Sequence, residues 1–310
     1  MNKSYRILIS TAFCMVFACV HVCGEKPTWQ HASSNENSVK QSVAEYVQYS
    51  KSDSMKVVSL LNSARLQAEG TNFTIYFARK LLGLPYVAHT LEVDKRERLV
   101  VNLRQLDCTT YVENVVALTM CVRQKAYSFG AFCANLQKIR YRGGGVPHYL
   151  SRLPYFTAWI EANAAKGLFR AISSPVPPFS ATQKIHVYYM STYPSKYKML
   201  KENPEYVPQI AETERSLNKL AFKYIPKSAV KNTSLLRNTV KDGDIIALTT
   251  TLKGLDIQHI GFAVWHDDGL HLLNASSLRR KVVEEPQTLY VYLQKQRTMT
   301  GMRLVRLSWR

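Results

Sequence analysis

One cysteine of this chain stands where a helix is expected to begin. Cys108 follows Asp107, and Val112, Val115 and Val116 recur after it at three- and four-residue spacing, which predicts a helix with one buried face. Asp107 has the position of an N-cap carboxylate that accepts the free amides of the first turn. The positive end of a helix dipole favours the thiolate of a cysteine, which is its nucleophilic form. The stretch predicts a reactive cysteine, and the alternative is a small apolar residue at a helix start.

A nucleophilic cysteine needs a base, and His259 is the best placed of the eight histidines. It opens the apolar run His259–Trp265, which predicts a strand, and Gly261 leaves room there for a close approach. The next expected strand returns beside it and brings Asn274 or His271 toward the second ring nitrogen. These two residues are three apart in a strand and point to opposite faces, so only one of them can orient the histidine. We expect Asn274 to do so.

The remaining elements must position this pair. Helical periodicity comes first in the chain and short strand-like runs come later, which predicts an α+β fold whose sheet is mostly antiparallel. The glycine-rich residues 141–145 are expected to form a loop, because they lack the spacing of a phosphate-binding motif. Helices are expected at 57–64, 72–82 and 161–168 and within 197–220, a hairpin over 90–102, and strands at 186–190, 244–249, 259–265, 270–274, 281–284 and 302–307.

The amino end has the order of a secretory signal peptide. Lys3 and Arg6 precede an apolar run over residues 7–22, and small and polar residues follow from Gly24. We therefore expect a signal peptide at 1–24, a polar lead-in or tether at 25–54, and a single catalytic domain at 55–310. The mature chain is expected to be exported to the periplasm or cell envelope without a transmembrane span.

A lipoprotein is the alternative for this amino end. Cys19 closes a run that loosely resembles a lipidation box, although Phe17 is large for its position.

Three of the six cysteines lie in or beside the expected signal peptide. Cys108, Cys121 and Cys133 remain, and this odd number implies at least one free thiol in an oxidising compartment. Cys121 and Cys133 either pair or are buried thiols. No cysteine has the paired spacing of a zinc site, so no metal is expected.

The chain is strongly basic, with a formal net charge of +19 that falls to about +17 when Lys3 and Arg6 leave with the signal peptide. No motif of interleaved aromatic and basic residues indicates a nucleic-acid partner. An anionic polymer of the cell envelope is the expected contact of this surface, with plain solubility as the alternative.

The residues around these positions resemble a known superfamily. Residues 106–110, Leu-Asp-Cys-Thr-Thr, resemble the Asp-Cys-Ser/Thr nucleophile motif of the NlpC-type papain-like cysteine hydrolases of bacterial cell walls. Residues 259–262, His-Ile-Gly-Phe, resemble their His-Val-Gly strand, and residues 273–276 resemble the strand of their third catalytic residue. The chain is more closely similar to the N-acetylmuramoyl-L-alanine amidase-like branch. That match covers most of residues 70–310 and runs in order through 83–86, 107–110, 151–153, 242–246 and 254–259.

The resemblance implies a papain-like fold in which the helix of Cys108 packs against the carboxyl-terminal sheet. It implies that Cys108 is the nucleophile, His259 the general base and Asn274 the orienting residue, with Tyr86 and Asp107 on the substrate side of the cleft. The implied reaction is hydrolysis of the amide between N-acetylmuramic acid and L-alanine in peptidoglycan or its muropeptide fragments, with no metal or cofactor.

The chain departs from the family pattern at two positions. Many relatives have histidine where Asn274 stands, and Pro154 interrupts a position that is often histidine. An asparagine can hold an imidazole tautomer through its amide oxygen, but it supplies no charge. Two alternative functions remain. One is an endopeptidase that cuts within the stem peptide, and the other is a catalytically inactive wall-binding protein.

Overall fold

The computed structural model describes residues 46–93, 96–145 and 148–308. The expected signal peptide and most of the expected lead-in lie outside these residues. Among the described residues, the first elements are β1 (Val47–Gln48) and α2 (Lys51–Ala64). Ser50 and Asp53 form a capping box that starts α2 earlier than the apolar spacing indicated.

The predicted hairpin over 90–102 is wrong. In the described part of this segment the strand structure is β2 (Leu99–Val100), which pairs in parallel with β1. A segment of alternating charged and apolar residues can therefore also form a connection whose two halves do not pair with each other.

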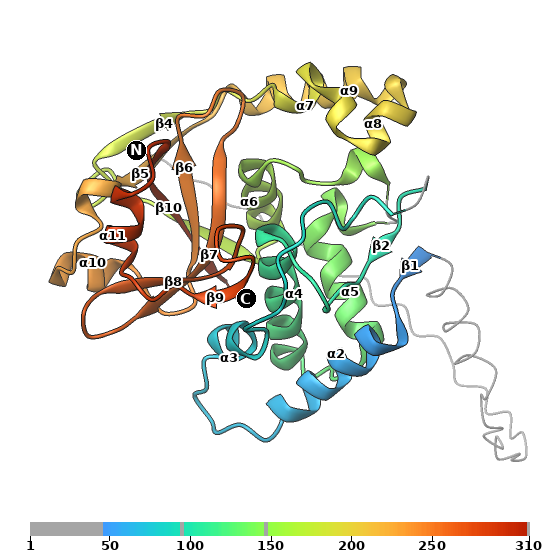
Figure 1. The fold of residues 1–310 in the computed structure, drawn as a ribbon, viewed down its shortest axis with the longest axis horizontal. Helices are drawn as coiled ribbons and strands as arrows, with labels where there is room; N and C mark the ends of the chain where they lie inside the picture. Colours follow the sequence, from blue (N-terminus) through green and yellow to red (C-terminus); the bar gives the residue numbers. More distant parts are fainter. Residues whose placement is uncertain (1–45, 94–95, 146–147, 309–310) are drawn as a thin grey trace, which may run out of the picture.

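The cysteine helix α4 (Cys108–Arg123) lies at the centre of the molecule. It contacts α3 (Phe73–Lys80) and α5 (Phe129–Arg140) on one side and the sheet on the other (Figure 1). Every residue from Thr110 to Cys121 is buried, so the helix is enclosed on all sides and does not have the single buried face that we expected. The next helix, α6 (Phe156–Ala165), begins earlier than the predicted 161–168.

Cys121 and Cys133, on α4 and α5, are free and buried thiols. The side-chain amide of Asn135 donates a hydrogen bond to the sulfur of Cys121 at 3.3 Å. The alternative of a disulfide between the two cysteines is excluded in this structure.

An eight-stranded sheet forms the other half of the fold, in the order β4-β5-β10-β6-β7-β8-β9, with β3 also paired to β10. Each of these pairings is antiparallel, as predicted. The five carboxyl-terminal strands lie where the sequence predicted them, within a few residues. The strands are β3 (Phe169–Ile172), β4 (Ala181–Lys184), β5 (Ala221–Pro226), β6 (Ile245–Thr250), β7 (Ile257–Trp265), β8 (Leu270–Ser276), β9 (Lys281–Glu284) and β10 (Met299–Leu307).

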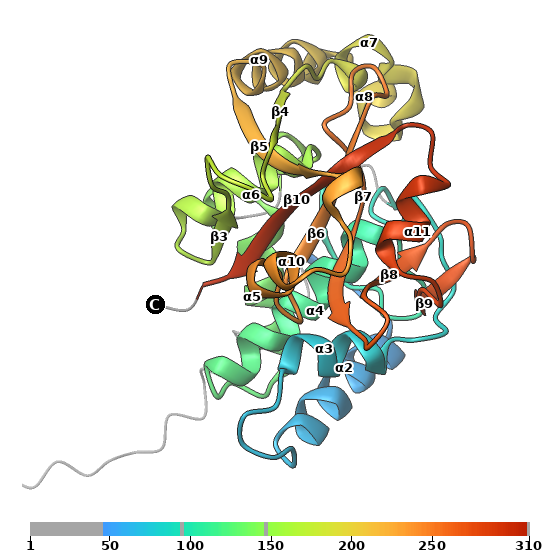
Figure 2. The ribbon, with the colours of Figure 1, turned by 90° about the vertical axis from the view of Figure 1, so that its left-hand side faces the viewer.

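Successive side chains of these strands serve two different cores. Phe262 faces α4, where its ring lies 5.7 Å from that of Tyr111. Ala263 and Leu272 face the opposite side, which is covered by two short helices (Figures 1 and 2). These are α10 (Ser234–Thr239) and α11 (Leu289–Gln294).

Three short helices lie beyond one end of the sheet, at the top of Figure 1. The predicted strand over 186–190 is wrong, because α7 starts within it. The helix-prone region 197–220 is divided into two helices by a turn at Asn203 and Pro204. The three helices are α7 (Tyr189–Thr192), α8 (Lys198–Glu202) and α9 (Val207–Leu217). No helix among the described residues is long and apolar enough to cross a membrane.

Candidate active site

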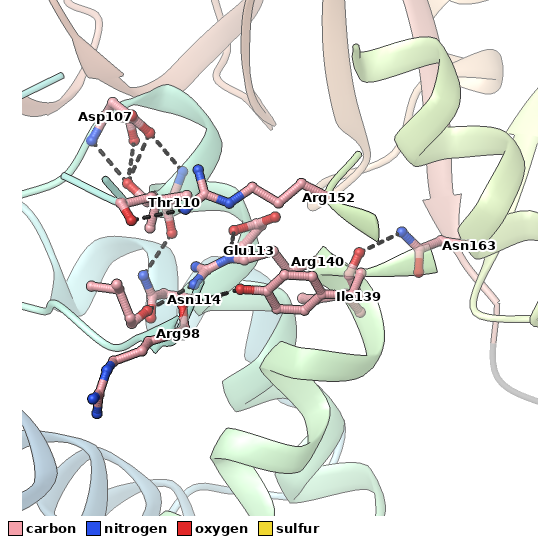
Figure 3. A network of polar contacts seen from close by, with 12 residues as sticks. Arg98, Asp107, Thr110, Glu113, Asn114, Ile139, Arg140, Arg152 and Asn163 are labelled. Carbon is pink, nitrogen blue, oxygen red and sulfur yellow. Dashed lines mark hydrogen bonds and ion pairs between the residues drawn. The ribbon is translucent and has the colours of Figure 1, made fainter. Parts of the chain in front are cut away.

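Cys108 is the first residue of α4, as predicted, and Asp107 is its N-cap. The Asp107 carboxylate accepts the amide of Thr110 at 2.8 Å, and the amide of Asp107 donates to the Thr110 hydroxyl at 2.9 Å (Figure 3). This reciprocal pair fixes the first turn of the helix. The amides of Cys108 and Thr109 precede the capped one, so the helix provides no acceptor for them.

His259 and Asn274 meet across neighbouring strands. Nε2 of His259 lies 2.8 Å from Oδ1 of Asn274, in a contact between two buried side chains. With the amide oxygen as acceptor, Nε2 carries the hydrogen and donates it, and the lone pair of Nδ1 is left to accept a proton. The arrangement is that of a general base held in one tautomer.

Cys108 and His259 line one cavity of ≈ 150 Å³. The start of β7 contributes to the lining, and the amide of Ile260 donates a hydrogen bond to the Cys108 sulfur. Leu153, Tyr155 and Met190 of α7 also line the cavity. The nucleophile and the base predicted from sequence are therefore brought together around a space that can hold a small part of a substrate.

The environment of Cys108 does not favour the thiolate that its place at the helix start led us to expect. Burial and, to a smaller extent, the nearby Asp107 carboxylate raise the pKa of the Cys108 thiol to about 12. Hydrogen bonds from Thr109 and Ile260 oppose this rise without cancelling it. Desolvation of the thiolate therefore outweighs the helix dipole, although the residue itself is partly exposed to the cavity.

Burial also lowers the pKa of His259, although the hydrogen bond to Asn274 and the charges of Glu285 and Asp107 act in the opposite direction. Both members of the pair are therefore neutral at rest. A neutral imidazole is the form that can accept the thiol proton during attack on a substrate.

His271 is held away from this centre. Its Nδ1 lies 2.8 Å from the backbone oxygen of Glu285, and its Nε2 lies 2.9 Å from the carboxylate of Asp268. Both ring nitrogens are thus engaged, and Asn274 is the residue that contacts His259.

Tyr86 lies close to Cys108 through a backbone bridge to Leu106. Burial, together with the nearby Cys108 and Asp107, raises the pKa of the Tyr86 phenol to about 12. The phenol is therefore a neutral hydrogen-bonding group beside the nucleophile.

Asp107 lines a second cavity, of ≈ 240 Å³, that adjoins the first. Leu153, Met190 and Tyr197 border both spaces, so the two form neighbouring parts of one site. The second cavity also borders Glu113, whose carboxylate lies 2.7 Å from Nε of Arg140 in a buried ion pair (Figure 3). Its wall therefore combines apolar side chains with charged groups that already have partners.

The sequence matches the AmiA-like family, described as N-acetylmuramoyl-L-alanine amidase-like, over residues 76–300. The chain belongs to this family. A comparison with curated proteins found no match.

Solved structures resemble this AmiA-like chain along most of its length. An N-acetylmuramoyl-L-alanine amidase from Bacteroides uniformis is 39% identical, with a TM-score of 0.72 over 78% of this chain and 100% of that one. A Bacteroides fragilis structure named as a candidate xylanase is also 39% identical, with a TM-score of 0.69 over 74% of this chain and 99% of that one. A protein from Legionella pneumophila shares the fold at 20% identity, with a TM-score of 0.62 over 89% of this chain and 97% of its own.

Several residues of the AmiA-like site were not identified from sequence. Met190 and Tyr197 come from the α7 and α8 region, where we expected a strand and an undivided helix. Asp256 stands in a segment that the resemblance had marked, and its carboxylate accepts the amide of Thr157 at the start of α6. This contact anchors the segment that leads into β7 and His259. No group of metal-binding side chains occurs in the described parts of the chain.

Proposed function

We propose that this chain is a cysteine-dependent hydrolase of the papain-like, NlpC-type superfamily that cleaves the amide between N-acetylmuramic acid and L-alanine. The observation that supports this most directly is the Asn274-bound imidazole of His259 on the same cavity as Cys108, in a member of an amidase-like family. The substrate is peptidoglycan or a muropeptide released from it.

In the first half of the reaction His259 takes the thiol proton of Cys108 on Nδ1, and the sulfur attacks the lactyl carbonyl carbon of the muramic acid. Because both groups are neutral at rest, the proton moves as the carbon–sulfur bond forms. The carbonyl oxygen becomes an oxyanion. The free amides of Cys108 and Thr109 at the start of α4 are suited to stabilise it.

The tetrahedral intermediate then collapses. The carbon–nitrogen bond breaks, and the imidazolium returns its proton to the departing nitrogen of L-alanine. A thioester between Cys108 and the lactyl carbonyl remains. Water attacks this thioester with His259 again as base, the carbon–sulfur bond breaks, and the sulfur regains a proton as the free acid leaves.

The two cavities suggest how the substrate is held. The apolar walls of Leu153 and Met190 fit the methyl groups of the lactyl ether and of L-alanine. Tyr86 and Asp107 both lie near the nucleophile, where a phenol can donate a hydrogen bond and a carboxylate can accept one from a substrate N–H.

We further propose that the protein acts after export, in the periplasm or cell envelope, with a lipid-anchored form as the alternative. The basic surface fits an anionic envelope polymer better than a nucleic acid. The charged and apolar pattern of residues 1–24, which is typical of a signal peptide, supports this proposal.

The test is digestion of two defined substrates followed by mass spectrometry. One is a tripeptide that begins with L-alanine and carries N-acetylmuramic acid, and the other is the same peptide without the sugar. The amidase should split the first into sugar and intact peptide and leave the second untouched. Cys108→Ala should lower the rate by several orders of magnitude, whereas Cys121→Ala should retain activity because Cys121 lies away from both cavities.

The same experiment separates the alternative functions. Cleavage of the free peptide between its second and third residues would identify a stem-peptide endopeptidase instead. Binding to both substrates without any cleavage would identify an inactive wall-binding protein. Full activity of the Cys108→Ala protein would overturn the cysteine mechanism.

A further inference from the structure

Glu285 is a buried carboxylate beside the catalytic centre that the mechanism above does not use. The residue is 2% exposed, and its Oε1 has no hydrogen-bond partner within the described residues. Its Oε2 lies 3.5 Å from Nε of Arg279, a side chain that is 48% exposed. A buried charge with so little pairing is costly.

The strand register puts Glu285 on the same side of the sheet as Asn274. Leu273 of β8 pairs with Glu284 of β9, and the amide of Glu285 donates to the carbonyl of Leu272 at 2.9 Å. Glu285 therefore stands opposite Leu272, two residues from Asn274. Side chains two residues apart in a strand project from the same face. The Glu285 carboxylate thus shares a face with the amide that holds His259.

The groups around Glu285 compensate the negative charge of its carboxylate only in part. Arg279, in the turn between β8 and β9, supplies the positive charge nearest to it. His271 of β8 contacts the backbone oxygen of Glu285 and not its carboxylate. Burial raises the pKa of Tyr292, on α11, to about 12, and the charges of Glu285 and Cys108 add to this rise, so the three groups lie near one another.

A negative charge here supplies what Asn274 cannot. The proposed reaction passes twice through a His259 imidazolium, and a neutral amide orients that ring without supplying a negative charge. Burial disfavours the charged form of the ring, whereas the hydrogen bond to Asn274 and the charges of Glu285 and Asp107 favour it. Asp107 is committed to the helix cap and lies beside the sulfur, which leaves Glu285 on the side of the orienting amide.

We propose that Glu285 is a positioning residue of the catalytic centre, whose buried carboxylate, on the same face of the sheet as Asn274, stabilises the imidazolium form of His259. The inference rests on the proposed cysteine mechanism and deepens it. The catalytic centre then consists of Cys108, His259, Asn274 and Glu285. The amide of Asn274 orients the imidazole, and the carboxylate of Glu285 supplies the negative charge.

The test compares Glu285→Gln with the full-length wild-type protein. Glutamine keeps the shape and removes the charge, so the pKa of His259 should fall. The acidic limb of the kcat/KM profile reports neutral His259 as base, and it should therefore move to lower pH. The value of kcat should fall about tenfold or more with little change in KM, because the charge acts on the transition state.

Glu284→Gln is the matched control. The Glu284 carboxylate is one residue away and lies on the opposite face, where it pairs with Arg79 at 2.9 Å and with His266 at 2.6 Å. This variant should leave the acidic limb in place. If Glu285→Gln lowers kcat but the limb stays at its wild-type position, the carboxylate acts through packing alone and the proposal is overturned.

Two further measurements keep the inference testable whatever the enzyme does. The pKa of His259 can be followed by the ring ¹⁵N shifts in an NMR titration, which needs no turnover, so an inactive wild-type protein would count against the amidase function and not against Glu285. Should Glu285→Gln fail to fold, Arg279→Gln changes an exposed side chain and uncovers the Glu285 charge. It should raise the pKa of His259, and an unmoved titration would refute the proposal.

Discussion

Gly261 lies directly against Asn274, so closely that position 261 has no room for a β-carbon. A β-carbon at Gly261 would stand 2.9 Å from Cβ of Asn274 and 2.7 Å from the carbonyl oxygen of Leu273. The first contact would push the orienting amide away from His259, and the second would press on the backbone of β8. The glycine therefore sets the spacing on which the contact between His259 and Asn274 depends.

Gly261→Ala should lower turnover by about 10-fold or more, because the displaced amide no longer holds the imidazole tautomer, and it should destabilise the fold by about 1–3 kcal/mol through overpacking. The measurements are kcat and the midpoint of thermal unfolding. Ala263→Val is the control, since it adds bulk to the same face of β7 two residues farther from His259. A loss of stability with normal kcat in both variants would show that the glycine serves packing only.

Asn274→Ala should lower kcat by roughly 10²-fold or more, as expected when the partner that holds a catalytic imidazole is removed. His271→Ala should change kcat little, because both ring nitrogens of His271 already bond to Glu285 and Asp268. The comparison needs kcat for both variants and a check that each unfolds cooperatively. The reverse pattern of effects would assign the orienting role to His271.

Much of this centre could be predicted from sequence because its signals are local. The N-cap of Asp107 and the position of Cys108 follow from a capping pattern within four residues, and the strands of His259 and Asn274 follow from short apolar runs. Few residues separate these two strands along the chain, so the strands pair as antiparallel neighbours. This pairing brings His259 and Asn274 together.

The parts that could not be predicted depend on tertiary structure. Strands β4 and β5 are short and only one of their residues is buried, so they lack the apolar run that marks the other strands. The raised pKa of Cys108 arises from desolvation in the tertiary structure, which no local pattern reveals. Glu285 reaches the centre only through the register of β8 with β9.

The high pKa of Cys108 predicts how the free enzyme reacts with iodoacetamide. The thiolate is the reacting form, so a thiol whose pKa is raised to about 12 should be alkylated slowly at neutral pH, with a rate that keeps rising through the alkaline range. Mass spectrometry of the Cys108 peptide after timed exposure from pH 5 to 10 gives this rate, and a small free thiol serves as the reference. A fast rate that does not change with pH would instead reveal a thiolate–imidazolium pair at rest.

The ion pair beside the second cavity provides a test of stability that is separate from catalysis. Glu113 and Arg140 are 4% and 3% exposed at their side chains, and burial raises the pKa of Glu113 even though Arg140 lies beside it. The attraction of Arg140 therefore does not fully offset the cost of taking the Glu113 carboxylate out of water.

Glu113→Ala should consequently destabilise the protein by about 3–5 kcal/mol, because it leaves the buried Arg140 guanidinium without a negative charge, with the Val100 carbonyl as its remaining acceptor. Glu212→Ala is the matched control, since Glu212 pairs with Arg215 on an exposed surface and such a pair contributes about 0–1 kcal/mol. Urea unfolding followed by circular dichroism measures both changes. Similar losses of stability in the two variants would contradict this expectation. They would mean that Arg140 contacts water or another acceptor in the Glu113→Ala protein, so that the wall of the second cavity is more open than its buried side chains indicate.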